Sequence, residues 1–419
     1  MLAEEVGEVD SYGGRLLPVI DLLFAGPEKN LLVLEREPDL ALSRYFTEIA
    51  GLTLPDMEIL EHKDYLDLGR QLSGDDLPDS SFLKILRQHP AGRLDGYVTD
   101  TILSAMAEEL GMPTFSSFEG SHEGNNKWLL HSYLESIGLP TPATQIAQSP
   151  ADISTCLDQL RRAGYSSAVI KAPMGASGIG LIKVEDLSAR GEAGELVPEH
   201  FFTEGPCLVQ GWLKPGEFGV SRVHSPSAQL FLSNDEVVIY DLTEQILSHE
   251  SVHEGNESPP PYLADHPEWR DELLRQAGEA GKWLHGCGYR GTASADFLLT
   301  EHDNGGFTVY VCELNARVTG ATYPSVLARH FMPEGAWLLR NLRFTEPVAG
   351  VELMELLRSA HDLFVPGESE SGVMPVNFNT GEDGLVHKGQ FLCLAPSSGG
   401  SKMLLEIARL DMPCIPDRD

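Results

Sequence analysis

One segment, Val309-Tyr-Val-Cys-Glu-Leu-Asn-Ala-Arg317, alternates apolar and polar residues with the period of a β-strand. Because side chains two positions apart share a face of a strand, Glu313, Asn315 and Arg317 line one side, and the intervening apolar residues can pack into a core. Three polar groups in a row on an otherwise apolar strand are costly unless they meet ligands. The segment therefore predicts a strand at the wall of a binding site.

A second apolar run, Ala295-Asp-Phe-Leu-Leu299, is interrupted by Asp296 in the same way. If 295–299 and 307–313 form a hairpin, Asp296 and Glu313 lie within a residue or two of directly opposite. Two facing carboxylates repel each other, but a hard divalent cation between them removes the conflict, and Asn315 adds a neutral oxygen ligand. We therefore predict a Mg²⁺ site here. The alternative is a hairpin with one solvated face.

A glycine-rich loop, Lys171-Ala-Pro-Met-Gly-Ala-Ser-Gly-Ile-Gly180, follows the predicted strand 168–171. Glycine permits close approach of the backbone, so N–H groups of such a loop can surround phosphates while the lysine neutralises their charge. The loop is not a P-loop, because no Lys-Ser/Thr follows its last glycine. A plain turn with a surface lysine is the alternative explanation.

Strands and helices alternate along the first 120 residues, which is typical of a small α/β domain with a parallel sheet. We expect strands at 31–34 and 57–61, and a helix at 102–110 that ends at Gly111.

The middle of the chain is predicted to begin with an amphipathic helix at 126–137 that ends at Gly138. Its apolar stripe comprises Leu129, Leu130, Tyr133, Leu134 and Ile137. Further helices are expected at 153–163 and 269–285, strands at 207–210 and within 219–241, and a loop over the proline-rich stretch 250–267. His249 and His253 have helical zinc-ligand spacing, but a loop explains them better than a zinc site. After about residue 347 we expect a small unit of strands, with a loop at 397–401.

Length and charge limit the classes of function. The chain has 419 residues, enough for roughly two to four domains. With 30 Lys and Arg against 63 Asp and Glu, its formal net charge is −33. Such a surface repels nucleic-acid phosphates and anionic lipid headgroups, so we expect neither nucleic acid nor membrane as a partner. A nucleotide would have to be held by locally placed cations, backbone N–H groups and metal ions.

The cellular compartment is predicted from three features that the sequence lacks. No apolar run approaches the roughly 18 residues of a membrane-spanning helix. The N-terminus is acidic where a secretory signal would be basic. The six cysteines are scattered without a C-x-x-C pair, which favours reduced thiols. These features predict a cytoplasmic protein.

Taken in order, the segments resemble the ATP-grasp superfamily of carboxylate–amine ligases over roughly residues 121–345. Lys127, at the start of its helix, resembles the first lysine on the ATP phosphates, and Lys171 resembles the second, with a catalytic role. The loop that follows Lys171 is similar to the family's mobile glycine-rich loop through Gly175, Ser177, Gly178 and Gly180. The adenine-binding hinge is matched by Gln210, Gly211, Trp212 and Leu213.

The remaining family positions are matched downstream. Glu217 resembles the ribose-binding residue. The family's Mg²⁺ ligands are matched by Asp296, Glu313 and Asn315, and the arginine that steadies the transferring phosphoryl group by Arg317. Two positions depart from the usual pattern: Gln210 stands where a glutamate is common, although its amide oxygen can still accept a bond from the adenine amino group, and Asp296 replaces the commoner glutamate.

The layout of the chain also resembles peptide ligases of the pheganomycin type, through Arg317-Val-Thr-Gly-Ala-Thr-Tyr-Pro324 and Val373-Met-Pro-Val-Asn-Phe-Asn379. The resemblance implies an α/β fold that is α+β in its ATP-binding part. It implies a pre-ATP-grasp domain at 1–120, an ATP-grasp domain at 121–345 with a lid at about 143–210, and a small C-terminal domain at 346–419.

The activity implied by the resemblance is ADP-forming ligation of a small-molecule carboxylate to an amine, on amino-acid or peptide substrates, through an acyl phosphate. The implied cofactors are ATP and two Mg²⁺ ions, with Mn²⁺ as an alternative metal. Arg222 and Arg317 are candidates for the substrate carboxylate, although Arg222 is equally explained as a surface arginine. A kinase on the same fold and a non-catalytic nucleotide-binding module stay open, as does a homodimer.

Overall fold

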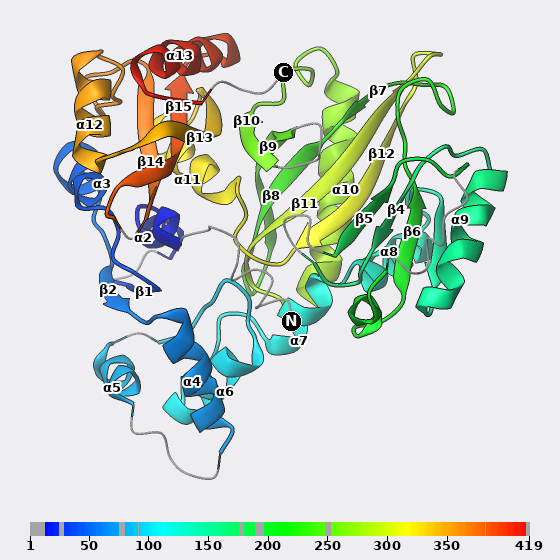
Figure 1. Ribbon diagram of the computed structural model, residues 1–419, viewed down its shortest axis with the longest axis horizontal. Coiled ribbons are helices and arrows are strands. Elements are labelled where there is room, and N and C mark those ends of the chain that lie inside the picture. Colours follow the sequence, from blue (N-terminus) through cyan, green and yellow to red (C-terminus); the bar gives the residue numbers. More distant parts are fainter. Residues whose placement is uncertain are drawn as a thin grey trace. The chain divides into compact units, whose positions relative to one another are not determined.

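The chain forms the mixed α/β structure that the sequence predicts, divided into two compact units (Figure 1). The computed structural model describes residues 13–24, 29–74, 80–90, 92–175, 180–188, 197–247, 253–381 and 383–415. The first unit contains Ser116–His253 and Tyr262–Val318, and the second contains Val9–Phe115, Glu254–Pro261 and Thr319–Asp419. Across the described ranges, no helix combines the length and the apolar character that a membrane span requires.

The larger sheet of the first unit has the strand order β12-β11-β8-β9, and β7 pairs with the second half of β11. Its strands are β7 (Val220–His224), β8 (Pro226–Leu232), β9 (Val237–Leu247), β11 (Gly291–His302) and β12 (Phe307–Asn315). Helix α10 (Pro267–Gly286) covers one face, where its buried residues pack against alternate apolar residues of the strands. Because the pleat has a period of two, the polar residues of β8, β11 and β12 lie on the opposite face.

The smaller sheet of the first unit is antiparallel with the order β3-β6-β4-β5. Its strands are β3 (Thr144–Ala147), β4 (Ala168–Lys171), β5 (Leu181–Val184) and β6 (Cys207–Gly211). Helix α9 (Ile153–Arg162) packs on this sheet through Ile153, Leu157 and Leu160. This sheet places Lys171 at the end of β4 and Gln210 near the end of β6.

Helices α7 (Phe118–Gly124) and α8 (Lys127–Ser136) precede the small sheet. Asn126 caps α8 by accepting bonds from the backbone N–H groups of its first turn. The predicted apolar stripe of this helix was partly wrong, since Leu129 and Ile137 are exposed, whereas Leu130 and Leu134 enter the core. Two positions one turn apart therefore carry the packing.

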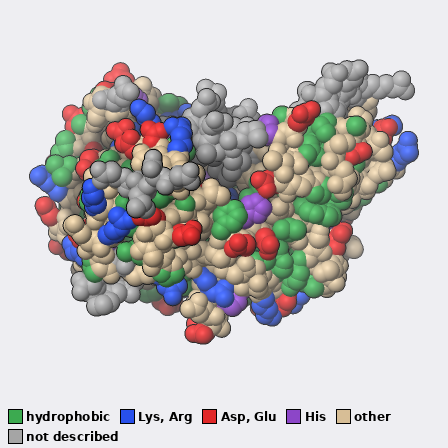
Figure 2. Space-filling model, turned by 90° about the horizontal axis from the view of Figure 1, so that it is seen from below, with side chains coloured by type: hydrophobic (Ala, Val, Ile, Leu, Met, Phe, Trp, Pro, Cys, Tyr) green, Lys and Arg blue, Asp and Glu red, His purple; other side chains and the backbone are tan. Residues whose placement is uncertain are grey.

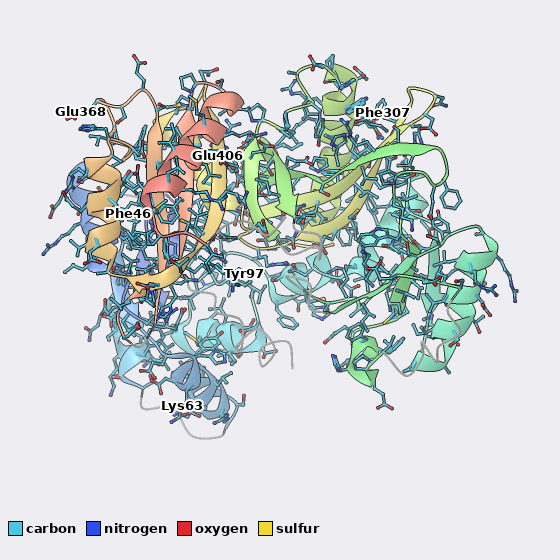
Figure 3. The ribbon with its side chains drawn as sticks, turned by 45° about the horizontal axis from the view of Figure 1, so that its top comes forward. Phe46, Lys63, Tyr97, Phe307, Glu368 and Glu406 are labelled. Carbon is cyan, nitrogen blue, oxygen red and sulfur yellow. The ribbon has the colours of Figure 1, made fainter. Side chains whose placement is uncertain are left out.

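The N-terminal part of the second unit contains the predicted parallel pair β1 (Leu31–Leu34) and β2 (Asp56–Ile59). The helical elements around it are α2 (Ile20–Leu23), α3 (Leu40–Arg44), a π-helical segment (Tyr45–Ile49), α4 (His62–Leu72), α5 (Ser81–Gln88) and α6 (Thr101–Leu110). Phe46 in the π-helical segment is buried, whereas Lys63 on α4 is exposed (Figure 3). Helix α6 ends at Gly111 in the left-handed conformation, as predicted.

The rest of the second unit is a sheet with the order β10-β13-β15-β14 and three helices. Its elements are β10 (His253–Ser258), α11 (Thr322–Phe331), β13 (Ala336–Val348), α12 (Gly350–Ser359), β14 (Gly372–Thr380), β15 (Val386–Ala395) and α13 (Ser398–Asp411). The predicted loop over 250–267 was partly wrong, because His253–Ser258 form a strand paired with β13. The predicted loop at 397–401 is the start of α13, where Ser397 caps the helix.

The proposed boundary at residue 345 falls inside β13, which pairs with β15 from Ala336 onward. The C-terminal strands therefore share a sheet with β13, most of which lies within the predicted ATP-grasp domain. The division into three domains itself stays a prediction. Acidic and basic side chains are interspersed on the face shown in Figure 2, so the negative charge forms no single uninterrupted patch there.

Candidate active site

The hairpin of β11 and β12 places Asp296 directly opposite Glu313, as predicted. Ser227 donates a hydrogen bond to Oδ1 of Asp296 at 2.7 Å, and the amide nitrogen of Asn315 donates to Oδ2 at 2.9 Å. Burial and repulsion by Glu313 raise the pKa of Asp296. Because the amide nitrogen of Asn315 is engaged, its oxygen is the atom that remains for a cation. The set of two carboxylates and one amide oxygen suits Mg²⁺.

Lys127 forms an ion pair with Glu313. Its Nζ lies 3.1 Å from Oε2 of Glu313 and donates to the carbonyl oxygen of Gly175 at 3.3 Å. Burial acts to raise the pKa of Glu313, but Lys127, Arg317 and Lys171 together hold that pKa below its usual value. Glu313 is thus kept ionised mainly by positive charge around it, with Lys127 in direct contact.

The glycine-rich loop begins and ends within the described part of the chain. Gly180 adopts a positive φ of 78°, and its carbonyl oxygen accepts a bond from the backbone N–H of Ala172, which closes the base of the loop. Two of its predicted phosphate-binding residues, Ser177 and Gly178, lie outside the described residues. Gly175 is described, and its carbonyl oxygen contacts Lys127.

The predicted hinge follows directly from β6. Gln210 is buried, and its amide nitrogen donates to Thr144 Oγ1 at 3.0 Å, so its amide oxygen remains as an acceptor for an adenine amino group. Gly211 has no room for a side chain, since an added Cβ would lie 2.4 Å from the ring of Tyr165. The backbone N–H of Trp212 donates a hydrogen bond to the carbonyl oxygen of Ser167. The ammonium of Lys183 lies over the indole ring of Trp212.

Glu217, the predicted ribose residue, is fixed by two neighbours. Ser166 donates to its Oε1, and Lys214 lies 3.3 Å from the same oxygen. Burial acts to raise the pKa of Glu217, but these contacts lower it overall. Within the described residues its second oxygen, Oε2, is buried without a hydrogen-bond partner. A buried acceptor of this kind fits a ribose hydroxyl donor.

The two candidate arginines differ sharply. Arg317 is 9% exposed, and its Nη1 donates to Asn125 Oδ1. The side chain of Arg222 is 69% exposed and lies 3.9 Å from Glu301. The structure thus brings Arg317 to the carboxylate pair, whereas the environment of Arg222 favours the alternative of a surface arginine.

Sequence reasoning missed three buried polar residues next to the site. Ser227 and Gln229 lie on β8, and Gln229 donates to Ser227, which in turn donates to Asp296. The alternation Pro226-Ser-Ala-Gln-Leu-Phe-Leu232 is a signal that could have found both. Asn125, the partner of Arg317, had no comparable signal. It lies between two helices and belongs to no repeating pattern of apolar and polar residues.

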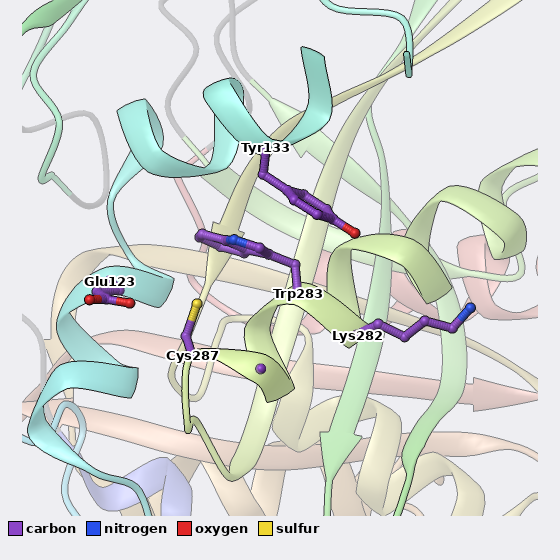
Figure 4. A pocket seen from close by; sticks show the side chains of 6 residues that line it. Glu123, Tyr133, Lys282, Trp283 and Cys287 are labelled. Carbon is purple, nitrogen blue, oxygen red and sulfur yellow. The ribbon is translucent and has the colours of Figure 1, made fainter. Parts of the chain in front are cut away.

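A pocket of about 460 Å³ lies elsewhere on the first unit and contains none of the predicted site residues. Tyr133 and Trp283 stack across it, with Glu123 and Cys287 nearby (Figure 4). Burial and the neighbouring Glu123 raise the pKa of the Cys287 thiol to about 11, so this thiol is a weak nucleophile. In the described ranges, no group of three or more His, Cys, Asp or Glu could hold a metal.

Comparison with known proteins agrees with this geometry. The family described as "ATP-grasp domain" matches residues 124–321, which span the predicted phosphate lysines, the predicted hinge and the carboxylate hairpin. This part of the chain is an ATP-grasp domain. A curated relative, the [butirosin acyl-carrier protein]–L-glutamate ligase of Niallia circulans, is 30% identical over 202 residues. That match covers 48% of this chain and only 45% of the relative.

Solved structures share the ATP-grasp fold at low sequence identity. The N5-carboxyaminoimidazole synthase of Aspergillus clavatus, in complex with ADP, has a TM-score of 0.55 at 14% identity and covers 91% of this chain and 99% of that one. The biotin carboxylase of Campylobacter jejuni has a TM-score of 0.60 at 13% identity and covers 92% of each chain. At these identities the likeness shows the fold alone.

Proposed function

We propose that the protein is an ATP-dependent, ADP-forming carboxylate–amine ligase that makes an amide or peptide bond. One observation carries the proposal: Lys127 forms an ion pair with Glu313, which stands opposite Asp296 in the β11–β12 hairpin. This arrangement suits the triphosphate of ATP with its metal ions and the carboxylate that it activates. The relative named as a carrier-protein–L-glutamate ligase supports amino-acid chemistry.

In the proposed reaction, an oxygen of the substrate carboxylate attacks the γ-phosphorus, and ADP leaves. The nitrogen of the amine then attacks the acyl carbon, and phosphate leaves with the bonding electron pair as the amide forms. Lys127 and Lys171 hold and neutralise the phosphates, and Arg317 stabilises the oxygens of the transferring phosphoryl group. Gln210 and Glu217 hold the adenine and ribose. In this division of roles, the protein mainly positions the reacting groups and neutralises their charge.

Asp296, Glu313 and Asn315 would hold Mg²⁺, which when bound would supply positive charge to neutralise the phosphates. The residues fit the ion, because two opposed, partly buried carboxylates need a counter-charge and the amide of Asn315 is already oriented by Asp296. The closure of loop 175–180 over the phosphates, implied by the family, falls largely outside the described residues.

The test measures ADP formation from MgATP with a panel of amino acids, L-glutamate first, each with and without amines that include ammonium and a second amino acid. We expect ADP release that depends on both partners, and an amide product by mass spectrometry. Lys171→Ala, Glu313→Ala and Arg317→Ala should abolish turnover without unfolding the chain. A phosphorylated product without any amide would support the kinase alternative, and nucleotide binding without turnover would support the non-catalytic one.

A further inference from the structure

Asn125 lies between α7 and α8 and makes four hydrogen bonds through its side chain. Its Oδ1 accepts from Nη1 of Arg317 at 2.5 Å and from the backbone N–H of Ala316 at 3.1 Å. Its Nδ2 donates to the carbonyl oxygens of Ser121 at 2.7 Å and Ala316 at 3.3 Å. One amide therefore contacts both the guanidinium of Arg317 and the backbone just before it.

These contacts determine the orientation of the amide. Two N–H donors face Oδ1 and two carbonyl acceptors face Nδ2, so a flipped amide would oppose like groups at every contact. Asn125 is 7% exposed and Arg317 is 9% exposed, so water competes little for these bonds. A bond between a neutral acceptor and a buried guanidinium is stronger than one between neutral groups.

The packing of α7 brings Asn125 to this place. Gly120 and Gly124 lie one turn apart on α7. A Cβ on Gly120 would lie 2.4 Å from the backbone nitrogen of Tyr289, and one on Gly124 would lie 2.9 Å from Cβ of Ala316. At Gly120 the helix therefore lies against the segment before β11, and at Gly124 against the residue after β12, with no room for a larger side chain at either position.

The segment that follows Asn125 reaches the same strand a second time. Asn126 caps α8, and Lys127, the first residue of that helix, pairs with Glu313 on β12. Neighbouring residues thus contact a predicted phosphoryl-binding arginine and a predicted metal ligand. Asn125 does so without any charge of its own, which suits a residue that orients a cation rather than neutralising it.

We propose that Asn125 is a positioning residue that holds the guanidinium of Arg317 in the orientation required by the transferring phosphoryl group. The inference rests on the proposed role of Arg317 in phosphoryl transfer. It predicts that removal of the Asn125 amide affects the transferring group and leaves the binding of ADP unchanged.

Two measurements on the full-length protein test the inference without knowledge of the acid or amine. The first is NMR of ¹⁵N-arginine-labelled protein, with the Arg317 guanidinium signals assigned through Arg317→Lys. The second is the ratio of the dissociation constants of MgADP and MgADP–aluminium fluoride, a mimic of the transferring phosphoryl group. The variants are Asn125→Ala, Asn125→Asp, which keeps an acceptor oxygen, and Asn126→Ala as the matched control.

In Asn125→Ala we expect faster rotation of the Arg317 guanidinium and a preference for aluminium fluoride reduced roughly 10- to 100-fold. Asn125→Asp should retain the restricted rotation, which keeps the test decisive if Asn125→Ala does not fold. Asn126→Ala should weaken both nucleotide complexes alike through Lys127 and leave their ratio unchanged.

Unchanged guanidinium signals in Asn125→Ala, or lost restriction in Asn125→Asp, would overturn the inference. The inference would also be overturned if Asn125→Ala and Asn126→Ala changed the ratio of the two dissociation constants equally. If Arg317→Lys leaves the ratio unchanged, the proposed role of Arg317 fails instead, and the NMR signals still decide whether Asn125 orients it.

Discussion

Replacement of Lys127 by Met should change metal and nucleotide binding in opposite directions. In the structure, the Lys127 ammonium lies 3.1 Å from the Glu313 oxygen that is predicted to bind the metal. At this distance and an effective dielectric constant of about 20, the Coulomb energy of the pair is about 5 kcal/mol. Since Glu313 is 31% exposed and Lys127 is 11% exposed, solvent screening reduces the net interaction to about 1–3 kcal/mol.

Without nucleotide, a divalent cation must displace this ammonium from Glu313. At about 1.4 kcal/mol per factor of ten, Lys127→Met should raise the Mn²⁺ affinity of the nucleotide-free protein roughly 5- to 100-fold. The same change removes a cation from the phosphates, so ATP affinity should fall by roughly tenfold or more. Methionine preserves most of the side-chain volume, so packing at the start of α8 is kept.

Mn²⁺ binding can be followed by electron paramagnetic resonance and ATP binding by calorimetry. Lys282→Met is the matched control, because Lys282 pairs with Glu279 at 2.8 Å on the exposed side of α10 and belongs to no part of the site. It should change neither affinity. The reasoning is refuted if Lys127→Met binds Mn²⁺ no more tightly than the wild type, or if it binds ATP equally well.

Four further substitutions test individual candidate residues of the site. Asp296→Asn and Glu313→Gln should each abolish MgATP-dependent ADP formation, because each removes a carboxylate that is predicted to bind the metal. The circular dichroism spectrum should stay native. Residual turnover at ordinary Mg²⁺ concentrations would contradict the assignment of these residues as metal ligands. Glu217→Ala should weaken ADP binding roughly tenfold, because an ionised acceptor is lost, and equal binding in calorimetry would remove the ribose role. Arg222→Ala should change kcat/KM by less than about threefold, because its side chain is exposed and paired only loosely with Glu301; a larger loss would restore it as a substrate residue.

The carboxylate hairpin could be predicted because its signal is local. The period of two in 309–317 and the turn between the strands together define which residues face each other, and Asp296 stands opposite Glu313 as expected. The start of the helix at Lys127 could also be predicted, since asparagine, here Asn126, is a favoured N-cap residue. Elements with a repeating pattern or a capping residue were therefore accessible from the sequence.

Other features depend on contacts between distant segments. The strand His253–Ser258 was missed because adjacent prolines indicated a loop, whereas pairing with β13 determines its conformation. The role of Asn125 was missed because its partner, Arg317, lies 192 positions further along the chain. Such residues carry no periodicity, so only the folded chain reveals them.

The charges of the site explain how a chain with a net charge of −33 can bind a polyanion. Within the protein, the opposed carboxylates Asp296 and Glu313 are contacted by hydrogen-bond donors and by the Lys127 ammonium. On binding, the phosphates would take over Lys127 and Lys171, and the metal ions would take over the carboxylates. The charged side chains of the protein then change partners without being newly buried, so their own desolvation cost was already met when the site folded. The acidic surface opposes only the distant approach of ATP, an effect that added salt screens.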